Sequence, residues 1–187
     1  MKRIYIIAVF VCFFMLQNQT QSQGFAQLDK NPVDIAYLKP KNFSKPLIKV
    51  VYSRPKKKSE KVFGEQIPFD KIWRTGANEA TEVKFYNDVK IGNKIVKKGT
   101  YTLQTIPGEK EWTVILNSKT DTWGAVFYDP EKDVVRIKVP VKKGRPVDVF
   151  SIAFKQDYND TFMVLAWDTE RVGIPIETNV QVLADLY

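Results

Sequence analysis

The sequence predicts an all-β protein, a single-domain antiparallel β-sandwich of jelly-roll-like form. Short runs of β-branched and aromatic residues recur along the chain, with Gly, Pro, Asn or Asp turn signals between them. No window of about 11 or more residues carries the 3.6-residue period of an amphipathic helix. Many short strands joined by turns are typical of sandwiches and jelly rolls.

The first 24 residues predict a secretory signal peptide. Lys2 and Arg3 make a positive start, an apolar run at 4–16 follows, and a polar stretch ends in small residues at Ser22 and Gly24. Because the apolar run is shorter than the roughly 20 residues of a transmembrane helix, we expect cleavage near Gly24 rather than an uncleaved anchor. The mature protein is then exported, either periplasmic or secreted to the cell surface, with no transmembrane segment.

Composition limits the chemistry that is open to this protein. The 187 residues include no histidine and one cysteine, Cys12, which lies in the signal segment. Ser-His-Asp sites, Cys-His sites and His-bearing zinc sites are therefore excluded, as is a disulfide within the mature chain. Carboxylate, Lys, Tyr and Arg chemistry remains open, and we predict no cofactor and no metal.

The chain is moderately basic. Its formal charge is +8, and loss of Lys2 and Arg3 leaves 27 cations against 21 anions, or +6. Lysines gather at 56–58, 97–98 and 142–143 beside Pro or Gly, where turns leave the charges in solvent. For an exported protein, an anionic envelope surface or solubility explains this charge better than nucleic acid, which we do not expect as a partner.

Residues 25–45 are predicted to form a linker or N-terminal arm, and residues 46–187 the β-sandwich domain. Prolines interrupt the arm, and it shows no helical period. Ile35, Tyr37 and Phe43 could still add a short edge strand to the domain.

The first strands of the domain are predicted at 48–52, where Pro55 stops the run, and at 82–86, where apolar residues alternate. Residues 89–91 and 94–96 flank Gly92-Asn93. Gly at the first central position is typical of a type II′ turn, so these residues predict a hairpin.

Turn signals divide the rest of the chain into further strands. Pro107-Gly108, with Pro at i+1 and Gly at i+2, is predicted to join 101–106 to 112–116. Turns are also expected at Lys143-Gly144 and Asp168-Thr169. The remaining predicted strands are 125–128, 134–139, 147–154, 162–167 and 172–176.

The segment Trp73–Thr81 (WRTGANEAT) differs from both ordinary strand and ordinary surface. Gly76 permits a turn with φ > 0, and Asn78 tolerates the left-handed conformation and bonds its own backbone. Arg74 and Glu79 bring opposite charges to the two sides of that turn. The ring of Trp73 beside the Arg74 guanidinium suits a sugar, a carboxylate or a partner loop.

Two interpretations of this segment stay open. Arg74 and Glu79 could pair across a buried corner and serve the structure, or they could face a cleft and hold a polar ligand, with Arg54 joining them. Trp123, beside Gly124, is a candidate ligand platform. Trp112 and Trp167 lie within apolar predicted strands and are expected in the core. The candidate binding residues are Arg54, Trp73, Arg74, Thr75, Asn78, Glu79 and Trp123.

Asp157, Asn159 and Asp160 place oxygen ligands of the kind that calcium prefers in one loop. No further acidic ligand follows at a suitable spacing. An Asx turn is therefore the favoured interpretation.

Several motifs resemble a known family. They are SRP at 53–55, IWRTGANEAT at 72–81, GTYTL at 99–103, IPGE at 106–109, EWTVILN at 111–117 and WGA at 123–125. The sequence resembles the DUF2911 family of exported proteins from Bacteroidetes and their relatives, from about Leu47 to Ile176. The family has no assigned function, so the resemblance implies export and a single domain but no activity, cofactor or catalytic residue.

Three functions follow from these features. The leading hypothesis is an exported, non-catalytic binding or interaction domain for a glycan, a peptide or an envelope component. The alternative is a carboxylate-dependent hydrolase acting on glycans or another envelope polymer, which needs two carboxylates roughly 5 to 9 Å apart. Glu79 could be one of them, and the sequence offers no convincing second. The third is a purely structural envelope protein.

Overall fold

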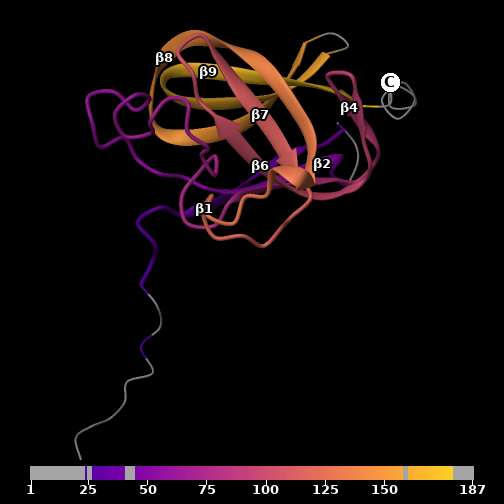
Figure 1. Ribbon diagram of the computed structural model, residues 1–187, viewed down its shortest axis with the longest axis horizontal. Helices are drawn as coiled ribbons and strands as arrows, with labels where there is room; N and C mark the ends of the chain where they lie inside the picture. The colour runs from indigo at the N-terminus through magenta and orange to yellow at the C-terminus, as the bar shows by residue number, and fades with distance from the viewer. Residues whose placement is uncertain (1–23, 25–26, 41–44, 158–159, 179–187) are drawn as a thin grey trace, which may run out of the picture.

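The computed structural model describes residue 24 and residues 27–40, 45–157 and 160–178. Nine strands form one sheet in which every neighbouring pair is antiparallel, in the order β1-β2-β3-β6-β7-β8-β9-β4-β5 (Figure 1). The strands are β1 (Val33–Leu38), β2 (Ile48–Ser53), β3 (Thr81–Phe85), β4 (Val89–Ile91), β5 (Lys94–Val96), β6 (Gly99–Ile106), β7 (Glu111–Asn117), β8 (Asp133–Asp157) and β9 (Asp160–Thr178), with a 3-10 turn η1 (Pro130–Lys132).

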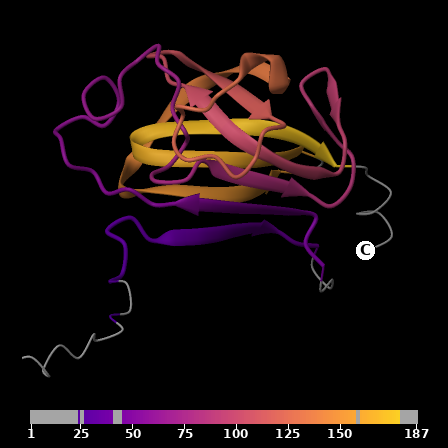
Figure 2. The ribbon, with the colours of Figure 1, turned by 60° about the horizontal axis from the view of Figure 1, so that its bottom comes forward.

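The prediction of an all-β antiparallel fold is confirmed, and the described residues contain no α-helix. The strands are hydrogen-bonded in a single order, so the two-sheet sandwich and jelly-roll detail is not confirmed. The sheet curls strongly, and β1 lies close to β8 although the two strands are not neighbours in the sheet order (Figure 2).

Within the part of the chain that the structure describes, no helix is long and apolar enough to cross a membrane.

The predicted N-terminal arm contributes a strand. Residues 33–38 pair with 48–53 in register from Val33 opposite Ser53 to Leu38 opposite Ile48. Ile35 and Tyr37 lie on this edge strand, as the apolar residues of the arm suggested, and Phe43 lies outside the described residues. Figure 2 shows the indigo β1 running beside β2 below the curled yellow β9.

The predicted strands between 134 and 176 were too many. Residues 133–157 form one strand and residues 160–178 another, and together they make a long curved hairpin. Lys143-Gly144 is not a chain reversal, because the pairing shifts there by a β-bulge between Lys143 and Val147. Asp168 likewise adopts φ +48 within β9. Bulges bend and twist a strand without ending it, so turn residues inside β8 and β9 produce curvature (Figure 1).

Two turn predictions have different outcomes. The hairpin around Gly92-Asn93 is confirmed, since Val89–Ile91 pairs with Lys94–Val96 and Gly92 has φ +58. Residues 101–106 and 112–116 do pair, but Gly108 is not among the residues with positive φ. A Cβ at Gly108 would lie 2.5 Å from the Glu111 carbonyl oxygen, so a close backbone approach requires this glycine.

The strand predicted at 125–128 is wrong. Residues 124–127 form a turn, in which Gly124 has φ +69. Val126 and Phe127 are 84% and 56% exposed, so these apolar residues do not form a buried strand face. Three apolar residues after a glycine therefore mimic a strand in sequence alone.

An aromatic cluster occupies the centre of the core. The Trp73 ring lies edge-on to Phe63, Trp112 and Phe150, with centroid distances of 5.9, 6.0 and 5.1 Å. It also stacks on Trp167 at 5.9 Å with an interplanar angle of 26°. All five residues are buried, and such pairs add to the apolar area that they remove from water. The cluster joins the 54–72 loop to β7, β8 and β9.

We predict that Trp73→Ala lowers the free energy of unfolding by about 3–5 kcal/mol, because it removes a large ring from a packed core. Urea unfolding followed by circular dichroism measures the loss. Trp123→Ala is the matched control, since Trp123 is 59% exposed, and it should change stability by less than about 0.5 kcal/mol. Equal losses in the two variants would contradict the central place of Trp73.

An ion pair fixes the 54–72 loop to the bulge of β9. Lys57 Nζ lies 2.8 Å from Asp168 Oδ2, and both side chains are less than one-third exposed. Burial alone would raise the pKa of the Asp168 carboxyl. The hydrogen bond and charge of Lys57, together with backbone N–H groups, outweigh burial and hold this pKa below 3.8.

We predict an acid-dependent stability term from Asp168. Because its folded pKa is depressed, its contribution is present above about pH 4 and is lost as pH falls through the folded pKa. Asp168→Asn should therefore destabilise the protein by about 1 kcal/mol at pH 7, and the difference from the parent should shrink toward pH 3. Urea midpoints from pH 7 to pH 3 measure this, and a difference that is constant over that range would refute it.

Candidate functional site

Trp73 and Thr75 anchor the segment 73–81 in the interior. The backbone of Trp73 exchanges hydrogen bonds with Thr105 of β6 at 2.7 and 2.9 Å, and its ring Nε1 donates to the Gly76 carbonyl at 3.0 Å. The Thr75 side chain is fully buried, and its hydroxyl lies 3.1 Å from that of Thr105. Both residues were candidate ligand contacts, but their burial leaves neither side chain at the surface.

The unusual backbone angles fall on other residues than predicted. Thr75 and Asn78 have φ of +56 and +57, whereas Gly76 is not among the residues with positive φ. Gly76 is needed for space instead, since a Cβ there would lie 3.1 Å from both the Ser53 carbonyl oxygen and the Thr81 hydroxyl. The left-handed conformation predicted for Asn78 is confirmed.

Arg74 does not pair with Glu79. Its Nη1 donates to the Asn78 carbonyl oxygen at 2.9 Å, and that oxygen also accepts from the Gly124 N–H at 3.0 Å. No ion pair between described residues joins the two charges. The interpretation in which Arg74 and Glu79 pair across a buried corner is therefore wrong, because Arg74 closes its own turn and covers Gly124 while Glu79 is exposed.

The segment 78–80 pairs with the loop that carries Trp123. Glu79 lies opposite Trp123 in an antiparallel bridge, flanked by hydrogen bonds from Ala80 N to Thr122 O and from Gly124 N to Asn78 O. These flanking bonds make Glu79 and Trp123 a non-hydrogen-bonded pair, the type in which opposed side chains lie closest. Two candidate residues far apart in the sequence are thus adjacent on one face.

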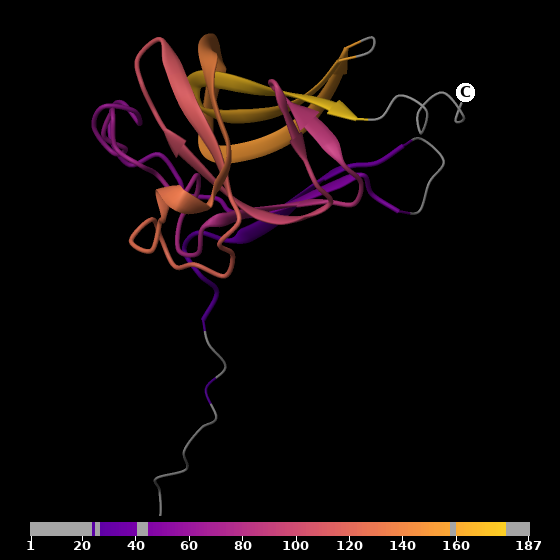
Figure 3. The ribbon, with the colours of Figure 1, turned by 45° about the vertical axis from the view of Figure 1, so that its right-hand side comes forward.

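This face carries a pocket of about 270 Å³ that is open to solvent. Glu79 and Trp123 line it together with Glu82 and Asp121, so three carboxylates share one concave surface. The Asp121 N–H donates to Glu82 Oε1 at 2.8 Å, which fixes the loop against β3. The loop with Trp123 lies between β7 and η1 and hangs below the sheet in the view of Figure 3.

One polar atom of the pocket lacks a partner. Thr122 lines the pocket and is 8% exposed, and its hydroxyl has no hydrogen bond among the described residues. A buried hydroxyl without a partner costs free energy.

Asn78 lies beside the pocket and holds the N-terminal segment. Its Nδ2 donates to Asp29 Oδ2 at 3.0 Å. The backbone N–H of Asn31 and this amide hold the pKa of the exposed Asp29 carboxyl below its ordinary value. The Asn78 side chain therefore bonds another segment instead of its own backbone as expected.

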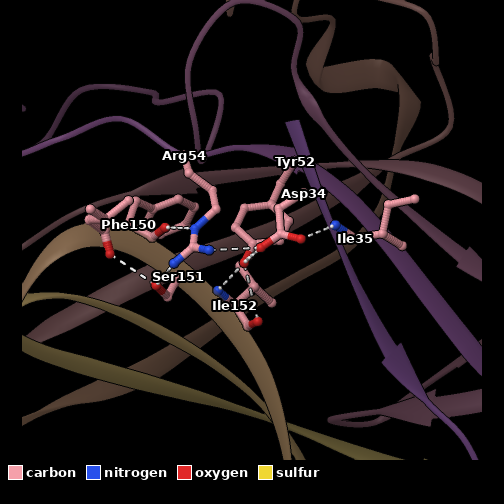
Figure 4. A network of polar contacts seen from close by, with 8 residues as sticks. Asp34, Ile35, Tyr52, Arg54, Phe150, Ser151 and Ile152 are labelled. Carbon is pink, nitrogen blue, oxygen red and sulfur yellow. Dashed lines mark hydrogen bonds and ion pairs between the residues drawn. The ribbon is translucent and has the colours of Figure 1, made fainter. Parts of the chain in front are cut away.

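Arg54 belongs to a separate network that joins β1 to β8 (Figure 4). Its Nη1 lies 2.9 Å from Asp34 Oδ2, its Nη2 donates to Ser151 Oγ at 2.8 Å, and its Nε donates to the Phe150 carbonyl at 3.2 Å. Arg54 thus ties β1 to β8 and does not join Arg74 in one cluster. Its planar group satisfies three partners at once, as a lysine cannot.

Tyr52 connects this network to the pocket. Its hydroxyl accepts from the Ile152 N–H at 3.0 Å, and Tyr52 also lines the pocket of Glu79. Burial of the phenol raises the pKa of Tyr52 above its ordinary value. The hydroxyl therefore stays protonated at neutral pH and serves as a neutral hydrogen-bonding group.

Of the seven candidate residues, the pocket brings together Glu79 and Trp123. Sequence reasoning missed Glu82, Asp121 and Thr122. Asp121 and Thr122 directly precede Trp123 in a polar loop, which was a usable signal. Glu82 lies between buried residues of β3 and offered no such signal, because a polar residue at any outward-facing strand position gives the same alternating pattern.

The described residues include no group of three or more acidic, His or Cys side chains able to hold a metal ion. The carboxylates of the Glu79 pocket are thus not arranged as a metal centre. Asn159 of the calcium hypothesis lies outside the described residues.

We predict that Arg54→Lys lowers the free energy of unfolding by about 1–2 kcal/mol, because a single ammonium cannot serve Asp34, Ser151 and Phe150 together. Arg74→Lys is the matched comparison, because Arg74 has one hydrogen-bond partner among the described residues, the Asn78 carbonyl oxygen. It should lose less than about 1 kcal/mol. Thermal and urea unfolding rank the two variants, and a larger loss for Arg74→Lys would overturn this account.

Comparison with curated proteins and with solved structures finds no match for this chain. The model of one protein family, described as a protein of unknown function (DUF2911), matches residues 26–176. The match begins before β1, so the edge strand is part of the family's domain, whereas an origin in Bacteroidetes stays a prediction. Because the match covers most of the chain, the protein belongs to the DUF2911 family.

Proposed function

We propose that this protein is an exported, non-catalytic binding module that takes a hydroxyl-rich ligand, one sugar unit of a glycan, in the Glu79–Trp123 pocket. The observation that carries the proposal is the convergence of three carboxylates and an exposed indole on one open pocket. The family has no assigned function, so the ligand class rests on this chemistry alone.

Trp123 supplies the apolar contact. Its ring is 59% exposed although a tryptophan gains free energy from burial. The backbone bonds of Ala80 and Gly124 on either side hold the main chain at Trp123 in place, so little backbone freedom is lost when a flat ligand covers the ring. A sugar ring presents apolar C–H groups on one face and suits such a platform.

The polar groups select hydrogen-bond donors. Carboxylates of Glu79, Glu82 and Asp121 only accept hydrogen bonds when ionised, and they accept strongly from hydroxyl groups. A carboxylate ligand, one of the classes suggested by the sequence, would meet three like charges and is disfavoured. The volume of about 270 Å³ is at the small end of ligand pockets, which fits a single ring.

Export is part of the proposal and rests on the signal-like start of the chain. The positive n-region, the apolar run and the small residues near Gly24 support it. An exported protein meets glycans of the envelope and its surroundings, which gives a sugar-binding pocket a ligand. Purified mature protein with Phe25 at its N-terminus would establish this step.

A carboxylate-dependent hydrolase of glycans is the second candidate, and one observation favours it. Glu82 and Asp121 line the same open pocket as Glu79. Either could be the second catalytic carboxylate, for which the sequence alone offered no convincing candidate. Acid and base pairs of this kind cleave glycosidic bonds when they face the bond from two sides. The binding function remains the leading proposal, because it uses the exposed Trp123 side chain as well as the carboxylates.

The test is titration with oligosaccharides of glucose, mannose, galactose and N-acetylglucosamine, followed by calorimetry and by tryptophan fluorescence. We predict that at least one binds, and that Trp123→Ala and Glu79→Gln each weaken it at least tenfold, or about 1.4 kcal/mol. Both variants should unfold within about 0.5 kcal/mol of the parent, since both side chains are exposed.

Glu109→Gln is the control, because it neutralises an exposed carboxylate in the β6–β7 turn. Its affinity should equal that of the parent. New reducing ends formed by the parent and not by Glu79→Gln would replace the binding function with the hydrolase. Affinity unchanged in Trp123→Ala would place any sugar outside this pocket.

A further inference from the structure

A second and larger pocket, of about 500 Å³, lies on the curved β8–β9 hairpin. Residues from the first half of β8, Lys155 near the end of β8 and residues from both halves of β9 line it. β9 bends so far that its first residues lie against its second half. A Cβ built at Gly173 would lie 3.6 Å from the Phe162 ring. The missing side chain at Gly173 leaves part of this space open.

Positive charge dominates the lining. Lys138, Lys142, Lys155 and Arg171 line the pocket, against one acidic residue, Asp160, so the net charge is 4 minus 1, or +3. The whole chain of 187 residues has a net charge of +8, so positive charge is concentrated at this pocket.

The cations differ in their freedom. Arg171 is fixed, since its Nη1 donates to the carbonyls of Asp168 and Glu170 at 3.0 and 2.6 Å and its Nη2 donates to the Arg145 carbonyl. Lys138 pairs with Glu111. The ammonium of Lys142 has no carboxylate partner among the described residues. An exposed ammonium without a carboxylate partner, beside a fixed guanidinium, is well placed to meet an incoming anion.

The other lining residues are apolar. Val139, Phe162, Val164 and Pro175 present hydrocarbon surface in the same pocket, and Phe162 and Val164 are only partly buried by the protein itself. Apolar surface left accessible inside a concave site favours a ligand that covers it. A purely ionic ligand such as a polyphosphate or a nucleic acid backbone would leave this surface wet.

We propose that the β8–β9 pocket binds an amphipathic anion, a molecule with one anionic head group and a hydrocarbon body. The body covers Phe162, Val164 and Pro175, and the head group meets Lys142 beside Arg171. Carboxylate and phosphate heads share this chemistry, since each offers oxygen acceptors to ammonium and guanidinium donors. The site is independent of the Glu79 pocket and of the sugar proposed there.

The test uses decanoate, decyl phosphate and the neutral decyl glucoside, each below its critical micelle concentration, with isothermal calorimetry on the purified protein. We expect the two anions to bind at least tenfold more tightly than the neutral compound, with an affinity that falls as salt rises. The stronger of the two anions identifies the preferred head group. Equal affinity for decyl glucoside overturns the requirement for an anion.

Two variants locate the site. Lys142→Gln should weaken the anions at least fivefold, and Gly173→Val should weaken them at least tenfold by filling the space beside Phe162. Lys94→Gln, the same change at an exposed position of β5, should leave affinity unchanged. Unfolding curves that match the parent keep the test valid for Lys142→Gln even if Gly173→Val folds poorly.

Inorganic phosphate separates the two parts of the ligand. It should bind at least tenfold more weakly than decyl phosphate, because it offers nothing to the apolar lining. Equal affinities would overturn the role of the hydrocarbon body, and unchanged affinity in Lys142→Gln would overturn the site itself. Trp123→Ala should bind decanoate as the parent does, so that failure of the sugar site leaves this result intact.

Discussion

The packing of the Trp73 ring among four other aromatic side chains is the interaction on which the rest of the molecule depends. Phe63, Trp112, Phe150 and Trp167 surround it, and they come from a loop and from three different strands. In a protein whose only cysteine is Cys12, burial of this kind supplies the cohesion that a disulfide supplies elsewhere. The long loop before Trp73 is thus held by the packing of its side chains, such as Phe63, rather than by regular strand pairing.

The site is a consequence of that anchoring. The side chains of Trp73 and Thr75 are buried, and they fix the start of the turn that follows. Arg74 closes this turn by donating a hydrogen bond to the Asn78 carbonyl oxygen. Glu79 is then presented beside Trp123. The polar segment is therefore structural on its inner side, through Trp73, Thr75 and Arg74, and is exposed on its outer side at Glu79.

Local signals in the sequence were enough for most strands and for the β4–β5 hairpin, where period and turn residues act over short distances. They failed where a signal has two meanings: Gly144 and Asp168 bend β8 and β9 instead of ending them, and the run at 125–128 is a turn. At the site, Glu79 and Trp123 were predicted individually. Their adjacency, the carboxylates of Glu82 and Asp121, and the true partners of Arg74 and Arg54 depend on pairing between distant segments, which no local pattern encodes.

The pairing of β4 with β9 has a consequence for how the chain assembles. Most neighbours in the sheet are also near neighbours along the chain, but Val89 must meet Thr178 at the far end of the described sequence. Closing so long a loop is entropically slow, so this contact belongs among the last to form. Until the final residues of β9 are available, a nascent chain exposes an unpaired strand edge, the kind of surface that recruits other chains. A chaperone that binds the chain before β9 has paired with β4 would therefore matter more for this protein than for a protein whose last strand is an edge strand.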